Sequence, residues 1–402
     1  VRPGGVLALA TALAAFAGAA LVRPFRLPLH SVGQVAISVA LPPLHHQLLV
    51  ALLAFGAAVL ALGWWLPDGR HTAQWSLVAL AGLVAPLFLA DALQAACALL
   101  LAAAALAPVL AHGDDDAPVA LFLGSAALGV ACLVVGLLVA QSTTPATWSQ
   151  RLGPARILVL VGLALLLGVA PAPLWLPGVV RRAHPVGAAL AAGGFPIVVM
   201  TIALLIARSE RPFEGWLVSA SDGQMVSAAG AATMIVASAV ALSRRDVRQI
   251  AGLLLAADLG FMTVGAGLGV TYDAALYPIV LLPLAARAIG VAVLLPALTL
   301  VTSGFRCALR PALVLLLACG AAIVLGGPLT PGYALRAEIL WIAADISGAL
   351  GAAILAGAGL MAVVWIVLVV RAWRLPLAES ARPCPRLALL LMGALAAGSL
   401  LL

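Results

Sequence analysis

Apolar segments, each about as long as a helix that crosses a bilayer, recur along the whole chain and end at charges, prolines or glycines. They consist mainly of Ala, Leu, Val and Gly, and their polar and apolar positions do not alternate as the strands of a membrane barrel require. The pattern therefore predicts an all-α polytopic membrane protein. The segments cover residues 5–22, 47–66, 72–90, 92–112, 118–140, 155–171, 186–207, 225–243, 247–269, 274–299, 308–326, 333–350, 352–371 and 385–402.

Two stretches indicate interrupted helices: residues 168–185 read GVAPAPLWLPGVVRRAHP and residues 326–332 read GGPLTPG. Proline and glycine break the backbone hydrogen-bond ladder, which the membrane tolerates only where protein or water satisfies the freed groups. We count 308–350 as one broken crossing, which gives about thirteen transmembrane helices. The positions expected to break the two helices are Pro171, Pro173, Pro177, Pro328, Pro331 and Gly332.

Paired interruptions in the two halves of a chain are typical of transporters built from inverted repeats. We therefore expect two inverted five-helix repeats, with an interfacial loop at 23–46 near the start of the chain. The expected organisation is N-terminal transmembrane helices at 1–91, a first repeat at 92–207, a connecting helix and loops at 208–246, a second repeat at 247–371 and a C-terminal transmembrane helix at 372–402.

Composition limits the classes of function. Of 402 residues, 65% are hydrophobic and 9% charged, which leaves no soluble domain large enough for a conventional active site. The net charge of +7 is spread over short loops, which argues against nucleic-acid binding. With thirteen crossings, 13 arginines fall on the side of the N-terminus and 6 on the other, which places the N-terminus in the cytoplasm, across a bacterial inner membrane.

Neither a catalytic group nor a metal or cofactor site is predicted. The five cysteines are scattered without a CxxC pair, and no nucleotide-binding or Ser/His/Asp pattern occurs. All 21 basic residues are arginines. Since a buried lysine can release its proton whereas arginine stays charged, the chain has no lysine to use as a proton-relay group.

Charged residues inside the apolar segments are the candidate site: Arg287, Arg336, Glu338, Asp258 and Asp345. A charge at the bilayer centre costs about 2.5–3.5 kcal/mol on insertion scales, so each should pair with another charge or line a hydrated path. Two interpretations remain open. The residues either form the polar axis of a proton path, or form arginine–carboxylate pairs that lock helices together or face partner subunits.

Three motifs, the first of them in two parts, resemble one family of membrane subunits. Residues 171–177 read PAPLWLP, 184–190 read HPVGAAL, 246–261 read DVRQIAGLLLAADLGF, and 327–336 read GPLTPGYALR. In this order they are similar to the broken-helix and conserved-helix motifs of the antiporter-like subunits shared by respiratory complex I, membrane-bound hydrogenases and multisubunit cation/proton antiporters. The resemblance implies a membrane subunit of a complex I-like (NADH–quinone oxidoreductase-like) or hydrogenase-like assembly, with other membrane subunits as its partners.

The departures from the family pattern concern its titratable groups. In the first half, the family's charged positions are filled by Leu100 or Leu101, by Leu166 and by a residue within 195–197. In the second half, Arg287 and Arg336 occupy positions where the family has lysine. We therefore expect no continuous hydrated path between residues 92 and 207.

The resemblance leaves two versions of the function open: proton translocation through the second half, or a degenerate, non-conducting scaffold. Its expected partners are other membrane subunits and the lipid bilayer, with H⁺ or Na⁺ as the ion if one moves. The alternative is a stand-alone secondary transporter of a small solute or ion, although a polar solute would need more hydrogen-bonding groups at mid-membrane than these helices carry.

Overall fold

The computed structural model describes residues 3–32, 35–64, 66, 69–111, 116–142, 148–169, 175–207, 220–272, 277–302, 310–328, 330, 332–375 and 386–401. Its elements are α1 (Pro3–Leu21), β1 (Phe25–Val32), β2 (Val35–Leu41), α2 (Pro43–Gly63), α3 (Gly69–Val84), η1 (Ala85–Phe88), α4 (Ala92–Leu110), α5 (Ala117–Gln141), α6 (Trp148–Leu167), α7 (Trp175–Arg182), α8 (Pro185–Ala189), η2 (Leu190–Gly194), α9 (Phe195–Ala207), α10 (Ala220–Ser243), α11 (Val247–Tyr272), α12 (Tyr277–Thr302), α13 (Arg310–Val324), α14 (Gly332–Ile346), α15 (Gly348–Arg374) and α16 (Arg386–Leu401).

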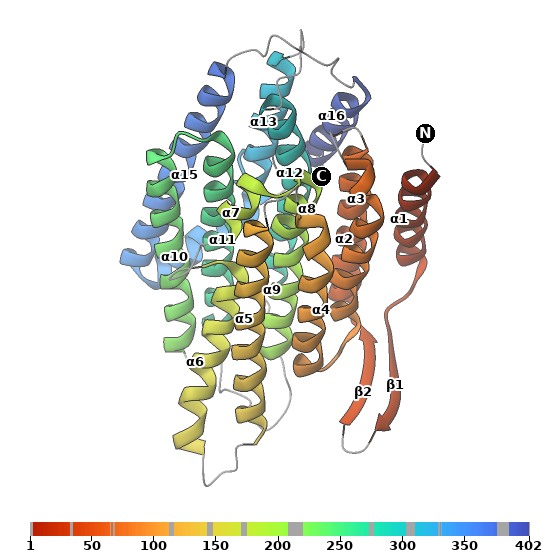
Figure 1. Ribbon diagram of the computed structural model, residues 1–402. Helices are drawn as coiled ribbons and strands as arrows, with labels where there is room; N and C mark the ends of the chain where they lie inside the picture. The colour runs from red at the N-terminus through yellow and green to blue at the C-terminus, as the bar shows by residue number, and fades with distance from the viewer. Residues whose placement is uncertain are drawn as a thin grey trace.

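The helices run side by side as a bundle, with α1 at one edge and α10 and α15 at the other (Figure 1). Within the described residues, eight helices are long and apolar enough to cross a membrane, and five shorter apolar helices accompany them. The membrane class predicted from the sequence is therefore supported. The count of thirteen crossings stays a prediction, because length and composition alone assign only the eight.

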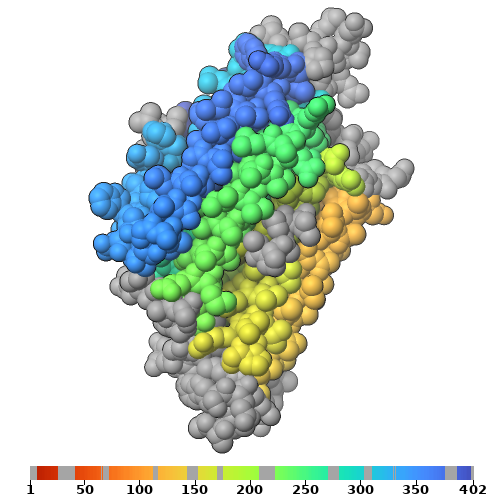
Figure 2. Space-filling view, turned by 90° about the vertical axis from the view of Figure 1, so that its left-hand side faces the viewer, coloured from red at the N-terminus to blue at the C-terminus, as the bar shows by residue number. Residues whose placement is uncertain are grey.

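The core of the bundle lies around α11, α12 and the helical stretch from α8 to α9. In the membrane-length apolar stretch of α11, 94% is buried inside the molecule. The same share is 28% in α15, which packs on α10 at the periphery (Figure 2). A helix that is apolar on all sides is buried in protein or faces lipid. The central position of α11 and α12 explains how they can carry charged side chains, because neighbouring helices cover those groups.

Both expected helix interruptions are present, and the same local structure ends the helix in each. Gly168 follows α6 with φ of 66°, and Gly326 follows α13 with φ of 60°. The backbone N–H of Val169 donates to the carbonyl of Ala164 (2.9 Å), and that of Gly327 donates to Ala322 (2.8 Å). This is the Schellman termination, in which a glycine adopts the left-handed conformation and closes the last turn. A glycine, rather than proline alone, therefore stops each helix.

The proline positions are only partly where the sequence analysis put them. Pro328 lies in the second interruption and Gly332 begins α14, as expected. Pro177 is not a break: it lies in the first turn of α7, where a proline needs no backbone N–H. Pro171, Pro173 and Pro331 lie outside the described residues.

The segment 23–46 differs from the expected loop, because β1 and β2 form an antiparallel hairpin there (Figure 1). Phe25 pairs with Leu41 and Val32 with Val35. Residues 35–41 read VAISVAL, and such β-branched, alternating stretches favour strands even when they are short. A search for bilayer-length apolar runs overlooks a signal of this length.

The helices α10 and α11, which share the most extensive contact among the described helices, have glycines where they meet. A Cβ atom added to Gly230 would lie 2.5 Å from the carbonyl oxygen of Gly260, and one added to Gly260 would lie 2.6 Å from that of Gly230. Small residues let membrane helices approach closely enough for backbone packing, because lipid offers no hydrophobic drive for their association. The two helices are therefore held by close backbone contact.

Replacing Gly260 by leucine is expected to destabilise the subunit by about 1–3 kcal/mol, because the new side chain has to push α10 and α11 apart. Denaturant titration in mixed micelles measures this loss. The matched control is Gly124→Leu on α5, where an added Cβ would meet nothing within 4 Å. The control should change stability by less than about 0.5 kcal/mol. Equal effects of the two variants would contradict the packing role of Gly260.

Candidate functional site

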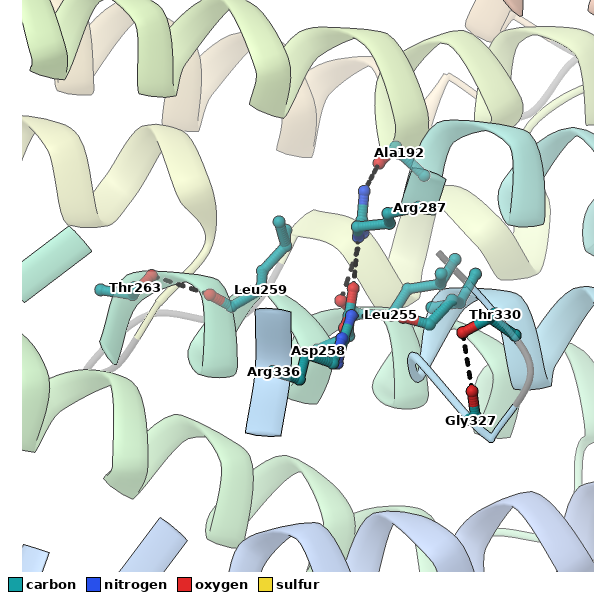
Figure 3. Close-up of polar contacts among 10 residues, drawn as sticks. Ala192, Leu255, Asp258, Leu259, Thr263, Arg287, Gly327, Thr330 and Arg336 are labelled. Carbon is teal, nitrogen blue, oxygen red and sulfur yellow. Dashed lines mark hydrogen bonds and ion pairs between the residues drawn. The ribbon is translucent and has the colours of Figure 1, made fainter. Parts of the chain in front are cut away.

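A buried ionic cluster lies at the centre of the bundle and joins three helices. Asp258 is near the middle of α11, and its side chain is fully buried. Arg287 on α12 donates from Nε to Oδ2 of Asp258 at 2.6 Å, and Arg336 on α14 donates from Nη2 to Oδ1 at 2.5 Å (Figure 3). One carboxylate therefore binds two guanidinium groups, one through each oxygen.

Backbone carbonyls supply the remaining contacts of Arg287. Its Nη1 donates to the carbonyl of Ala192, and its Nη2 donates to that of Leu255 at 3.3 Å (Figure 3). Ala192 belongs to η2, a π-helical turn between α8 and α9, and such turns depart from the regular i→i−4 ladder. The contact ties the first half of the chain to the second, across 95 residues of sequence.

At the interruption after α13, a backbone carbonyl likewise accepts a hydrogen bond from Arg336. Its Nη2 donates to the carbonyl of Val324 at 2.5 Å, and Val324 is the last residue of α13. Carbonyls at a helix end lack intrahelical partners and carry the negative end of the helix dipole, so they stabilise a cation. The guanidinium also lies 5.0 Å from the ring centroid of Phe261. A Cβ on Gly326 would overlap the Arg336 side chain, so glycine is needed there for space as well as for its positive φ.

The charges of the cluster do not cancel. Two guanidinium groups and one carboxylate give a net charge of +1, in side chains that are 0% exposed for Arg287 and Asp258 and 9% for Arg336. Taking such groups out of water costs several kcal/mol per ion, and removing one partner of a buried pair leaves an uncompensated charge. The carbonyls of Ala192, Leu255 and Val324 partly offset the excess positive charge.

Glu338 and Asp345 are not part of this cluster. Both are exposed on α14, and neither makes a salt bridge or hydrogen bond with any residue that the structure describes. The reason is helical geometry: at about 100° per residue, positions two and nine residues after Arg336 point about 160–180° away from it. The expected polar group of five residues therefore reduces to Asp258, Arg287 and Arg336.

Within residues 92–207, apolar side chains and aromatic rings pack together in the interior. Phe122, Trp175 and Phe195 are each 1% exposed, and their ring centroids lie 5.1–6.2 Å apart in edge-to-face contacts. Leu166 is also buried, whereas Leu100 and Leu101 are 41% and 71% exposed. Those two leucines face outward on α4. From the sequence, one of them was expected to fill a charged position of the family, but neither lies in the interior.

Sequence reasoning missed the carbonyl ligands of the cluster and two ion pairs outside it. Arg156 pairs with Asp222 and Arg181 with Asp246, both at 3.1 Å. Among the described residues, no three or more His, Cys, Asp or Glu side chains lie together so that they could hold a metal ion. Two indirect sequence signals pointed to carbonyl ligands: the small-residue run LAAGG at 190–194, where the π turn lies, and the predicted interruption at 326–332, before which α13 ends at Val324.

The fold and the buried cluster define a polytopic helical membrane protein with two interrupted helices and an ionic centre that joins α11, α12 and α14. Residues 119–362, more than half of the chain, match the model of the family described as NADH:quinone oxidoreductase/Mrp antiporter, transmembrane. The chain belongs to this family.

Two solved structures show the same fold at 16% sequence identity. One is a chain of the membrane-bound sulfane sulfur reductase, an archaeal respiratory membrane complex, with a TM-score of 0.79 over 99% of this chain and 73% of that one. The other is a chain of the Mrp complex from Dietzia sp. DQ12-45-1b, with a TM-score of 0.80 over 98% of this chain and 87% of that one. No curated protein matches the sequence.

Proposed function

We propose that this chain is a structural, non-conducting membrane subunit of a multisubunit complex of the complex I-like or hydrogenase-like kind. The observation that carries the proposal is the state of Asp258: both of its oxygens are bound by arginines, and all three side chains are buried. Arginine stays protonated in proteins, so neither guanidinium can pass a proton on. The cluster acts as an ionic clamp between α11, α12 and α14.

The packing of the first half supports the same proposal. A proton path needs titratable groups or ordered water, and an apolar interior holds water only where polar partners are present. The rings of Phe122, Trp175 and Phe195 fill this interior. The ionic cluster and the aromatic core therefore contain no side chain that is free to relay protons.

Proton translocation through the second half is the second candidate, and the position of Asp258 favours it. This carboxylate is buried near the middle of α11, where a relay group would have to lie. Conduction would require Asp258 to leave one of its arginines and take up a proton. Two charged partners and the carbonyl contacts of both arginines oppose that change.

A stand-alone transporter of a polar solute is a weaker proposal. A cavity of about 320 Å³ lies between α6, α9, α10, α11 and α12, and it is lined almost wholly by aliphatic side chains. Asp222 and Thr263 are the only polar residues among its described lining residues. A polar solute at this depth would lose its hydration without gaining enough hydrogen bonds.

The finer architecture also remains part of this proposal: two inverted repeats at 92–207 and 247–371, with the N-terminus on the cytoplasmic side of a bacterial inner membrane. The identical glycine terminations of α6 and α13 support the repeat. The connecting segment and terminal helices would then be additions to a repeated core.

The paired change Asp258→Asn with Arg336→Met tests the proposed function. It removes the titratable group but keeps the net charge of the cluster at +1, because Arg287 remains. In membrane vesicles that hold the assembled complex, we expect the proton-translocation rate to stay within about twofold of wild type, with Arg336→Met alone as the control. Loss of proton translocation by an assembled complex that contains the doubly changed subunit would instead establish conduction through Asp258.

A further inference from the structure

One face of α14 carries two acidic side chains on the exposed surface of the molecule. Glu338, Trp341 and Asp345 are all exposed, Trp341 to 78%. At about 100° per residue, positions 338, 341 and 345 fall within about 60° of one another around the helix. The two carboxylates make no salt bridge or hydrogen bond within the described chain, and α14 packs mainly against α15, α12 and α11 on its other sides.

The depth of Glu338 follows from its neighbour Arg336. Arg336 reaches Asp258 in the middle of α11, a helix that spans the bundle. Glu338 lies two residues further along α14, a rise of about 3 Å, and it points the opposite way. Asp345 lies about 10 Å beyond Glu338, next to the turn at Ser347 that caps α15. Glu338 is therefore near mid-membrane and Asp345 near one surface.

A carboxylate near the bilayer centre is unfavourable against lipid and normally pairs with another charge or faces water. We propose that this face of α14 binds a transmembrane helix of another subunit that carries an arginine or lysine opposite Glu338. The inference rests on the proposed membership in a multisubunit complex and adds the surface and charge of one partner. Trp341, lying between the two carboxylates, is the type of residue that anchors the centre of protein interfaces.

A second copy of this chain cannot supply the basic side chain that Glu338 needs near mid-membrane. The two arginines that the described structure places near mid-membrane, Arg287 and Arg336, are both buried and bound to Asp258. A lipid headgroup cannot supply this positive charge either, because its charge stays at the membrane surface, well away from Glu338. A basic side chain on a neighbouring helix is the group that reaches the required depth.

Removing the charge tests the proposal. In the complex purified through another tagged subunit, Glu338→Leu is expected to lower the recovery of this chain at least about tenfold, and Glu338→Gln is expected to lower it less. The matched control is Asp116→Leu, the same change at an exposed carboxylate at the start of α5. The isolated subunit reports folding: Glu338→Leu should leave its Tm unchanged or raise it. Wild-type recovery of Glu338→Leu in the complex, or a lower Tm of the isolated variant, would overturn the proposal.

A photo-crosslinking residue at position 341 identifies the partner. We expect a crosslink to a membrane helix that contains an arginine or lysine, whereas the same probe at Leu128, exposed on α5, serves as the reference for a face without charge. A crosslink only to lipid, to a second copy of this chain, or to a helix without a basic residue would overturn the proposal. These assays measure composition and contact, so their failure is distinct from a failure of the proton-flux test.

Discussion

Replacing Asp258 by asparagine is expected to destabilise the subunit by about 3–5 kcal/mol, whereas replacing Arg336 by methionine should cost about 1 kcal/mol or less. The first change leaves two buried guanidinium groups without an anion, so the net charge of the cluster rises from +1 to +2. The second change leaves a neutral pair of Arg287 and Asp258, held at 2.6 Å, and puts an unbranched apolar side chain in place of the aliphatic part of Arg336. Denaturant titration of the subunit in mixed micelles measures both losses.

The double change provides the decisive comparison for this cluster. Asp258→Asn combined with Arg336→Met should be less damaging than Asp258→Asn alone, because it returns the net charge to +1. The control is Asp246→Asn, which removes an exposed pair with Arg181 but keeps an amide that can cap the start of α11; it should cost less than about 1 kcal/mol. Additive losses for Asp258 and Arg336 would show that the two side chains are not coupled.

Replacing Trp175 by alanine is expected to cost about 3–5 kcal/mol, the range for deleting a fully buried aromatic side chain. Trp175 is 1% exposed and contacts the rings of Phe122 and Phe195 in the interior of the bundle. The cavity left behind would be lined by apolar groups and should stay dry, so proton leakage through vesicles should not rise. Stability in mixed micelles and proton leak in vesicles are the two measurements.

An exposed tryptophan provides the control for Trp175. Trp75 on α3 is 51% exposed, and Trp75→Ala should cost less than about 1 kcal/mol. If Trp175→Ala were as mild as Trp75→Ala, the aromatic cluster would not be a packed core. If it opened a proton leak, the first half would contain a path that the rings merely block.

The membrane class, the apolar helices and the two interruptions could be read from the sequence. Each is a local property: about 20 apolar residues are enough to specify a spanning helix, and clustered proline and glycine are enough to break one. The family likewise followed from motifs in local order, and the match over residues 119–362 confirms it. The hairpin at 25–41 was missed because its strands are shorter than the runs that reveal membrane helices.

The charged residues show where local reasoning stops. That Arg287 and Arg336 need a carboxylate follows from the sequence and the energetics of the bilayer. The exclusion of Glu338 and Asp345 was also within reach, because their spacing from Arg336 places them on the opposite face of a helix. The choice of Asp258 as the shared partner depended on how α11, α12 and α14 lie in space.

Only the tertiary structure decided which backbone groups complete the cluster. The carbonyls of Ala192 and Val324 bind the arginines because a π turn and a helix end bring them to the centre of the bundle. Every residue has a carbonyl, so no side-chain pattern marks the ones that become ligands. The sequence by itself determined that buried charges had to be compensated, and the packing of distant helices decided by which atoms.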